Sequence, residues 1–303
     1  MSDLLLKSGG EREPLQASFS DAANPVGLDG IEFIEYSTAK PQALGQVLEM
    51  MGFRPVARHR SREVLLYRQG GLNIVVNAHQ PVAAVEGRGE APAISAIALR
   101  VRDARAAYAY VLERGAWEVT THPEVMELNI PAIHGAGGSR IYFVDRYQEF
   151  SIYDVDFVPI PSVDPHPVTT AGIHFFGIVQ YIGPERSYDW IEFYRELIGA
   201  ELIPDEQRFG IMPKGKLLRT PALDPSKCFM IQLIEPDLNV LDADERLQRI
   251  GLGVPDVPAA VQALRALGVE FVETPAAHTE ARGAISKTYL GSVVFELVHD
   301  ERG

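Results

Sequence analysis

One carboxylate, Glu296, stands in the middle of an otherwise apolar stretch near the end of the chain, TYLGSVVFELVHD (Thr288 to Asp300). A short apolar run of this kind predicts a buried strand. A carboxylate in such a strand needs a cation or several hydrogen-bond donors beside it, or it must take up a proton. Glu296 is therefore the residue whose partner decides what chemistry this part of the chain can perform.

The composition is that of an acidic globular protein. Of the 303 residues, 46% are hydrophobic and 23% are charged, and the formal net charge is −13. This length allows two ordinary domains or one large one. The acidic balance, with basic residues scattered along the chain, argues against nucleic acid and membrane surfaces as partners. The single cysteine, Cys228, excludes an intrachain disulfide framework and a cysteine-built zinc site.

The N-terminal stretch reads as a polar leader. It runs MSDLLLKSGGEREPLQASFSDAANP and lacks a long apolar core before a cleavage site. No apolar run in the chain approaches the roughly 20 residues that a membrane span requires. We therefore expect a cytoplasmic protein in which residues 1–25 form a flexible leader.

An internal repeat organises the rest of the chain. A predicted strand containing Gly30 is followed by a helix that ends near Gly52, and a strand containing Gly177 is followed by a helix that ends at Gly199. Both intervals are 22 residues long. The two halves therefore begin with the same strand and helix order.

A second correspondence marks the next strand and helix of each half. Asp103 stands 12 residues before Gly115, and Asp256 stands 12 residues before Gly268. An aspartate can bond the free N–H groups at a helix start, and a glycine can adopt the left-handed conformation after a helix end. Each pair therefore predicts a helix with an Asp cap and a Gly stop.

The strands that follow complete two homologous modules. Strands are predicted at Glu63 to Tyr67, Leu72 to Val76 and Phe229 to Leu233, and a third correspondence sets Phe150–Tyr153 against Val293–Glu296. The fold class is thus α+β, with tandem βαβββ modules. We expect the N-terminal structural module at residues 26–157, a Pro-rich linker at 158–168 and the C-terminal module at 169–303.

Paired modules in this order resemble the vicinal oxygen chelate (glyoxalase/dioxygenase-like) superfamily. More narrowly, Gly27 to Asn77, Met126 to Gly138 and Asp145 to Val158 are similar, nearly word for word, to bacterial 4-hydroxyphenylpyruvate dioxygenases. The C-terminal half matches by spacing and through YDWIEFYREL (Tyr188 to Leu197). The resemblance covers about residues 25 to 300, and it implies that the N-terminal module is structural and the C-terminal module holds the site.

The resemblance also implies a ferrous ion held by two histidines and one glutamate of the C-terminal module. Glu296 matches the glutamate. The two histidine positions fall on Gly177, which has no side-chain ligand, and on Arg249, which stays protonated. We call the sheet face expected to carry these three positions the C-terminal cup. In the first module the same positions are matched to Gly30, Ala96 and Tyr153, none of them a good ligand for a divalent metal.

Arg249 offers Glu296 a partner, because both occupy positions that would converge on one iron. We hypothesise a buried ion pair in which the guanidinium replaces the positive charge of the metal. A related possibility is that Arg249 holds a small carboxylate ligand. Glu296 and Arg249 are then the candidate catalytic residues, and Gln232, Phe175 and Phe295 are the candidate substrate-binding residues. Phe176 is expected in the pocket lining with them.

A histidine outside the motif provides the other possibility. His174 lies three residues before Gly177, so a regular strand would point it away from the cup unless the strand bulges. With such a bulge, Glu296 and His174 become candidate metal ligands. The alternative to the ion pair is therefore a functional non-heme iron dioxygenase, or another metal-dependent vicinal oxygen chelate enzyme.

The sequence thus predicts a 4-hydroxyphenylpyruvate dioxygenase-like protein with a degraded iron site, which binds a small carboxylate or aromatic ligand such as an aromatic or 2-oxo acid. No cofactor is expected, and the alternative requires Fe(II) or another divalent metal. If the protein is an enzyme, it is an oxidoreductase of this type. The sequence leaves open whether it is catalytic and whether it forms a homo-oligomer.

Overall fold

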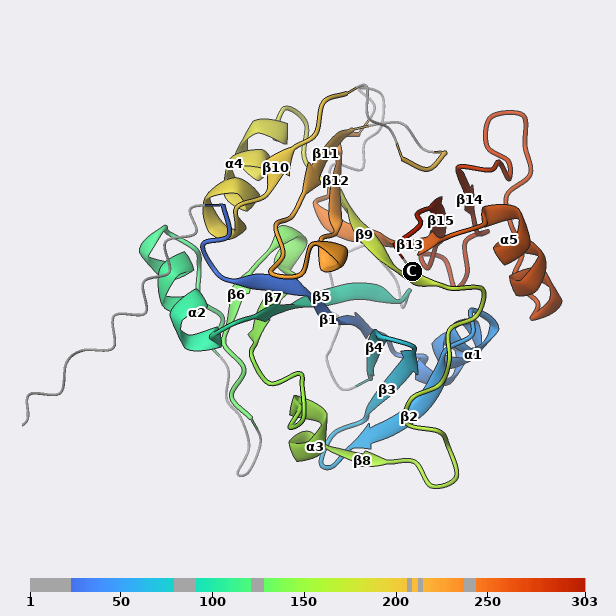
Figure 1. The fold of residues 1–303 in the computed structure, drawn as a ribbon, viewed down its shortest axis with the longest axis horizontal. Helices are drawn as coiled ribbons and strands as arrows, with labels where there is room; N and C mark the ends of the chain where they lie inside the picture. The colour runs from blue at the N-terminus through green and yellow to red at the C-terminus, as the bar shows by residue number, and fades with distance from the viewer. Residues whose placement is uncertain are drawn as a thin grey trace, which may run out of the picture.

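A computed structural model describes residues 23–78, 91–120, 128–205, 209–211, 215–236 and 244–302. They form two mixed β-sheets, and the helices lie beside them. In Figure 1 the strands β2, β3 and β4 of the first sheet lie below, and β9, β11 and β12 of the second lie above. This α+β architecture with two sheets agrees with the fold class predicted from the repeat.

The N-terminal module contains the first eight strands, with short helical segments between them. Its elements are β1 (Leu28–Ser37), α1 (Pro41–Met50), β2 (Arg54–His59), β3 (Val64–Gln69), β4 (Leu72–Asn77), β5 (Ala93–Val101), α2 (Ala104–Glu113), β6 (Ala132–His134), η1 (Ala136–Gly138), β7 (Arg140–Val144), α3 (Ile152–Asp156) and β8 (Phe157–Pro159). The strands are ordered β6-β7-β5-β1-β4-β3-β2-β8 in one sheet.

The C-terminal module repeats this order. Its elements are β9 (His174–Tyr181), α4 (Ser187–Ile198), β10 (Glu201–Leu202), β11 (Lys216–Arg219), η2 (Pro225–Lys227), β12 (Met230–Ile234), β13 (Arg246–Val254), α5 (Val257–Ala266), β14 (Gly283–Ile285) and β15 (Phe295–His299). Its sheet runs β10-β11-β12-β9-β13-β15-β14, which is the first sheet in reverse and without β8.

The predicted helix boundaries are confirmed. The carboxylate of Asp103 accepts a hydrogen bond from Ala106 N at the start of α2, and Asp256 accepts one from Ala259 N at the start of α5. Gly268 follows α5 with φ +101°, a conformation that is strained for residues with a Cβ. The caps and stops read from the sequence therefore position both helices.

The third sequence correspondence, which set Phe150–Tyr153 against Val293–Glu296, is wrong. Tyr153 lies in the helix α3, whereas Glu296 lies in the strand β15. The strand that corresponds to β15 is β7, because β7 pairs in parallel with β5 as β15 does with β13. The similarity in sequence was misleading because Ser151 and Asp154 form a capping box, which starts a helix at this point.

Strand pairing gives the corrected equivalences between the modules. Ala98 and Gly251 each stand five residues before a capping aspartate. Phe33 and Tyr142 lie opposite Ala98, as Gly177 and Glu296 lie opposite Gly251. The position matching Gly177 is thus Phe33 instead of Gly30, and the position matching Glu296 is Tyr142 instead of Tyr153. Ala96 keeps its match with Arg249.

One hydrophobic core joins the modules. It contains Leu99 of β5, Leu252 of β13 and Tyr194 of α4. Two smaller clusters lie on the other faces of the sheets. One contains Phe33 of β1, Tyr153 of α3 and Phe157 of β8, and we call the sheet face that it covers the N-terminal cup. The other contains Phe176, Ile203, Met230 and Val298 and lies on the C-terminal cup.

The segments expected as leader and linker are partly integrated into the fold. Residues 1–22 lie outside the described part of the chain, but Asn24 is buried and its Oδ1 accepts a hydrogen bond from Leu28 N at 2.7 Å. Val158 and Pro159 belong to β8, which pairs with β2. Arg68 Nη1 donates to Pro165 O. None of the helices in the described ranges is long and apolar enough to cross a membrane.

Candidate functional site

The three positions of the C-terminal cup lie close together on three neighbouring strands. Gly177 of β9 lies opposite Gly251 of β13, and Gly251 lies opposite Glu296 of β15. Arg249 stands two residues before Gly251 on β13, which places it on the same face. The structure thus brings together the positions that the sequence comparison predicted to converge.

Arg249 and Glu296 form the hypothesised ion pair. Arg249 Nε donates to Glu296 Oε2 at 2.9 Å, and the residues are only 2% and 4% exposed. Arg249 Nη1 donates to Gln248 Oε1, whereas its buried Nη2 has no hydrogen-bond partner among the described residues. The carboxylate therefore has the cation that its burial requires, and one guanidinium nitrogen is left with unused donors.

Gly177 has no space for any side chain. A Cβ built on this residue would lie 2.3 Å from the carbonyl oxygen of Met230 on the adjacent strand β12. That contact is with backbone, so a side chain could enter only if β9 and β12 moved apart. The absence of a histidine here is therefore built into the spacing of the two strands.

A cavity of about 680 Å³ opens over these strands. Glu296 and Gly177 both line it, so the cup is accessible to a small molecule. Aromatic walls come from Phe176 and Phe209, whose ring centroids are 5.4 Å apart. The volume falls within the range typical of small-molecule sites.

The candidate substrate-binding residues separate into two groups. Gln232 lines the cavity from β12. Phe175 instead packs against Phe229, with ring centroids 5.4 Å apart, next to the core shared by the modules. Phe295 is 1% exposed in the same core. Neither of these two rings is among the cavity-lining residues of the described chain, because both point to the opposite face of the sheet.

His174 lies on the cup side of its sheet because β9 does bulge. The pairing of β9 with β13 shifts between Gly177 and Phe175, where one residue is inserted. A Cβ on Gly253 would lie 2.2 Å from His174 Nε2, so the ring covers that glycine. The condition that allowed His174 to face the cup is therefore met, although its ring has other partners than Glu296.

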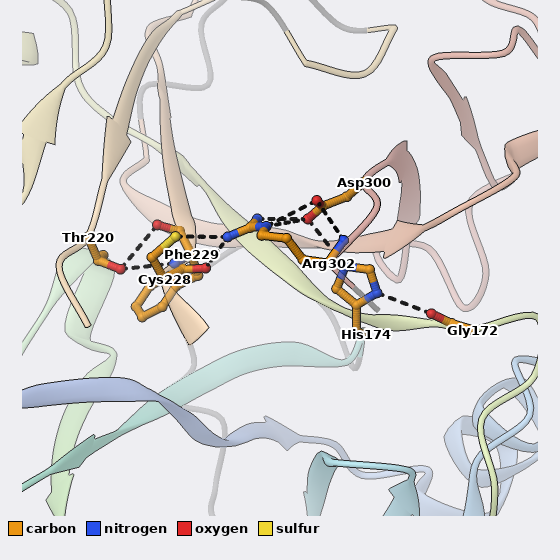
Figure 2. A network of polar contacts seen from close by, with 7 residues as sticks. All are labelled: Gly172, His174, Thr220, Cys228, Phe229, Asp300 and Arg302. Atoms are coloured by element: carbon orange, nitrogen blue, oxygen red, sulfur yellow. Dashed lines mark hydrogen bonds and ion pairs between the residues drawn. The ribbon is translucent and has the colours of Figure 1, made fainter. Parts of the chain in front are cut away.

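Those partners form the polar network of Figure 2. His174 Nε2 lies 3.2 Å from Asp300 Oδ2, and Nδ1 lies 3.1 Å from Gly172 O. Arg302 bonds the same carboxylate and also donates to the oxygen and sulfur of Cys228. Burial raises the pKa of Asp300, but hydrogen bonds from Arg302 and His174 outweigh it, so the net shift is downward.

This network gives His174 a structural role in the state described. Both ring nitrogens face acceptors, whereas a metal ligand must present a free nitrogen lone pair. The guanidinium of Arg302 lies 5.9 Å from the ring centroid of Phe176. The network therefore supports a wall of the cavity without adding a ligand atom to it.

Sequence reasoning missed several cavity residues. Phe209, Lys216 and Ile203 line the pocket. Phe176 was expected in the lining together with Phe175, and it does line the pocket from the bulged strand, whereas Phe175 does not. A bulge changes which face a residue occupies, and period-2 reasoning cannot locate it. The usable signal was Lys216, a cation that follows Gly215 and begins the strand β11.

The comparisons with known proteins agree on one family. A family model described as hydroxyphenylpyruvate dioxygenase, N-terminal, matches residues 22–158. Hemolysin VllY of Vibrio vulnificus (strain CMCP6) is 36% identical over 84% of this chain and 75% of its own length. A 4-hydroxyphenylpyruvate dioxygenase of Pseudomonas aeruginosa is 34% identical over 85% of this chain and 75% of its own length.

The structural comparison supports the fold. A mutant of 4-hydroxymandelate synthase from Streptomyces coelicolor superposes with a TM-score of 0.70 at 17% identity, covering 91% of this chain and 93% of its own. The similarity extends over both modules, so the tandem arrangement is common to the two proteins.

These relatives correct the expectation that no cofactor is needed. The resemblance implied iron-dependent chemistry, and similarity along most of a 4-hydroxyphenylpyruvate dioxygenase conflicts with a cofactor-free assignment. The three cup positions nevertheless do not fit an iron held by two histidines and a carboxylate. Gly177 offers no ligand atom, and Arg249 already occupies Glu296 Oε2. No group of three or more His, Cys, Asp or Glu side chains suited to a metal occurs in the described ranges.

Proposed function

Because the chain belongs to the 4-hydroxyphenylpyruvate dioxygenase family, we propose that its C-terminal cup binds a small aromatic or 2-oxo acid at a site whose iron-ligand positions have degraded. The observation that carries the proposal is the cavity of about 680 Å³ that reaches Glu296 while Arg249 holds that carboxylate. The proposal thus keeps a pocket over the three ligand positions, with the charge of Arg249 in place of that of a metal.

The lining supports an aromatic ligand with one acidic group. Phe176 and Phe209 form two walls that favour a ring, and Gln232 offers both a donor and an acceptor. Apolar side chains of Met230 and Val298 exclude water from the ring. A purely polar metabolite would make no apolar contacts with these walls.

The charges of the cavity orient the ligand. Arg249 is already paired with Glu296, so we place the acid group toward Lys216, the cation among the described lining residues, whose Nζ also lies 3.1 Å from Asp205 Oδ2. A ring hydroxyl or keto group then lies toward the Arg249–Glu296 pair. This orientation uses the ion pair as a polar anchor and leaves it intact.

Calorimetric titration with phenylpyruvate and 4-hydroxyphenylpyruvate tests the proposal. We expect Lys216→Gln to weaken binding about tenfold, equivalent to about 1.4 kcal/mol. Lys287→Gln serves as the control, because Lys287 pairs with Glu270 outside the cavity. Equal affinities of the two variants for these acids, or no binding to the parent at millimolar ligand, would contradict the proposal.

The degraded site also predicts low turnover. We expect little or no homogentisate from 4-hydroxyphenylpyruvate, because the histidine positions of the family are Gly177 and Arg249. Product formation measured with added ferrous iron and dioxygen checks this expectation. A normal enzymatic rate would refute it.

The bulge in β9 favours a second candidate, a metal-dependent oxygenase that uses Glu296 and His174. Such an enzyme requires His174 to leave Asp300 and Arg249 to leave Glu296. Metal content of the purified protein distinguishes the candidates. Stoichiometric iron that is lost in both Glu296→Gln and His174→Gln would favour the second candidate over the first.

A further inference from the structure

A second cavity, of about 310 Å³, lies on the N-terminal cup, where no site was expected. It is bounded by β1, β4 and β7 of the sheet and by the segment of α3 and β8. This cavity is independent of the C-terminal cup, because it belongs to the other sheet and shares no lining residue with the first cavity.

A buried carboxyl group forms part of the cavity wall. Glu35 of β1 is 8% exposed, and both Asn77 Nδ2 and Ser95 Oγ donate to its Oε1 at 3.1 Å. Its Oε2 receives no hydrogen bond from the described residues, and it is not sealed from the cavity. One oxygen of a costly buried group is therefore available to a donor from a ligand.

Two guanidinium groups line the same cavity. Arg140 of β7 donates from Nη1 to the hydroxyl of Tyr142 at 3.2 Å, and Arg62 lies in the turn after β2. Both also act on Glu35, whose pKa they lower while burial raises it, with burial the larger effect. Because the carboxyl groups of Glu35 and Asp156 lie in the same lining, the two guanidinium groups favour a ligand that carries both an anionic group and a hydrogen-bond donor.

Aromatic side chains form the remaining walls. The ring centroids of Phe33 and Tyr142 lie 5.9 Å apart, and those of His59 and Phe157 lie 5.2 Å apart in a T-shaped arrangement. All four residues line the cavity. These surfaces accept a planar ring, and a hydrated inorganic anion would leave them without contact.

We propose that the N-terminal cup is a second binding site, for a small aromatic carboxylate with a ring hydroxyl. The carboxylate bonds Arg140 and Arg62, the ring lies against Phe33 and Phe157, and the hydroxyl donates to Glu35 Oε2. The volume is near the lower limit for small-molecule pockets, which restricts the ligand to about one ring.

Calorimetric titration of the full chain with 4-hydroxybenzoate tests the proposal. We expect Arg140→Gln to weaken binding at least tenfold, because it removes the charged fork that receives the carboxylate. Arg105→Gln is the matched control, since Arg105 is exposed on α2 and lies outside the cavity. Benzoate should bind the parent several-fold more weakly than 4-hydroxybenzoate, because it lacks the donor to Glu35.

A second variant covers the case in which Arg140→Gln does not fold. Tyr142→Phe keeps the ring and removes only the hydroxyl bonded to Arg140, and we expect it to weaken binding about threefold. The C-terminal variant Lys216→Gln distinguishes the two cups: binding of 4-hydroxybenzoate that persists in Lys216→Gln and is weakened by Arg140→Gln belongs to the N-terminal cup, whether or not the C-terminal cup binds an acid. Equal affinities for Arg140→Gln and Arg105→Gln, or no binding of 4-hydroxybenzoate at millimolar concentration, would overturn the proposal.

Discussion

The N-terminal cup is filled at the point where the C-terminal cup is open. Phe33 and Tyr142 occupy the first, with their rings 5.9 Å apart and α3 covering them. The equivalent residues of the second are Gly177 and Glu296, which face a cavity of about 680 Å³. Since both sheets have the same strand order, the difference lies in side chains and in the segment that follows β7.

This contrast shows how one fold gives its two cups different pockets, a smaller one with aromatic walls and a larger one with an ion pair at its base. Aromatic rings over a sheet bury apolar area and stabilise the module. A glycine and an ion pair at the same positions contribute less packing but leave room for a ligand. The C-terminal cup therefore keeps a polar group at its base, Arg249–Glu296, at some cost in folding stability.

The largest effect is expected from breaking the ion pair of the C-terminal cup. Arg249→Ala leaves the carboxylate of Glu296 buried without a cation, so we expect the free energy of unfolding to fall by about 3–5 kcal/mol. Urea unfolding of the parent and the variant measures this change. The equivalent residue of the N-terminal cup is already alanine, Ala96, so this substitution has no counterpart there.

A double variant distinguishes the loss of the Arg249–Glu296 attraction from the cost of leaving the Glu296 carboxylate buried without a cation. Arg249→Met combined with Glu296→Leu removes both ions and fills their volume, so it should lose much less stability than Arg249→Ala alone. An Arg249→Ala variant as stable as the parent would mean that Glu296 is adequately solvated without the guanidinium.

The repeat made most of the fold predictable from the sequence. Asp103 and Asp256 indicated helix starts through local hydrogen bonds, and these do not depend on tertiary packing. The match of Phe150–Tyr153 with a strand failed because a capping box is also local and starts α3 there. A short apolar segment is compatible with a strand and with a helix, and a neighbouring helix-capping motif decides between the two.

The candidate site was predictable only in part. The proximity of Arg249 and Glu296 followed from matching positions along two strands. The lining by Phe176 and the placement of His174 depended on one inserted residue in β9. Such an insertion is defined by the pairing with the neighbouring strand. It therefore cannot be predicted from the alternation of apolar and polar residues within one strand.

A smaller effect is expected from adding one methyl group at the point where the two cups differ most. Gly177→Ala places a Cβ 2.3 Å from Met230 O, and separating two paired strands should cost about 1–3 kcal/mol. Gly251→Ala is the matched control on the same face, because the nearest atom to its Cβ is 3.4 Å away. Equal thermal midpoints for the two variants would show that β9 adapts without loss.

The smallest effect compares one buried carboxylate of each cup, Glu296 and Glu35. Glu296 has a guanidinium donor, whereas Glu35 has hydrogen bonds from the neutral side chains Asn77 and Ser95. Burial therefore raises the pKa of Glu35 above 4.5, although those hydrogen bonds and the charges of Arg140 and Arg62 lower it. Because the folded state binds this proton more tightly than the unfolded state, protonated Glu35 stabilises the fold below the unfolded pKa. That contribution is lost as the pH rises through the folded pKa.

Glu35→Gln resembles the protonated group at every pH. The variant should match the parent in free energy of unfolding below about pH 4.5 and exceed it near neutral pH. Urea unfolding measured across this range tests the sign of the difference. A variant that is less stable than the parent near neutral pH would mean that the charge of Glu35 is compensated in the N-terminal cup, as that of Glu296 is by Arg249.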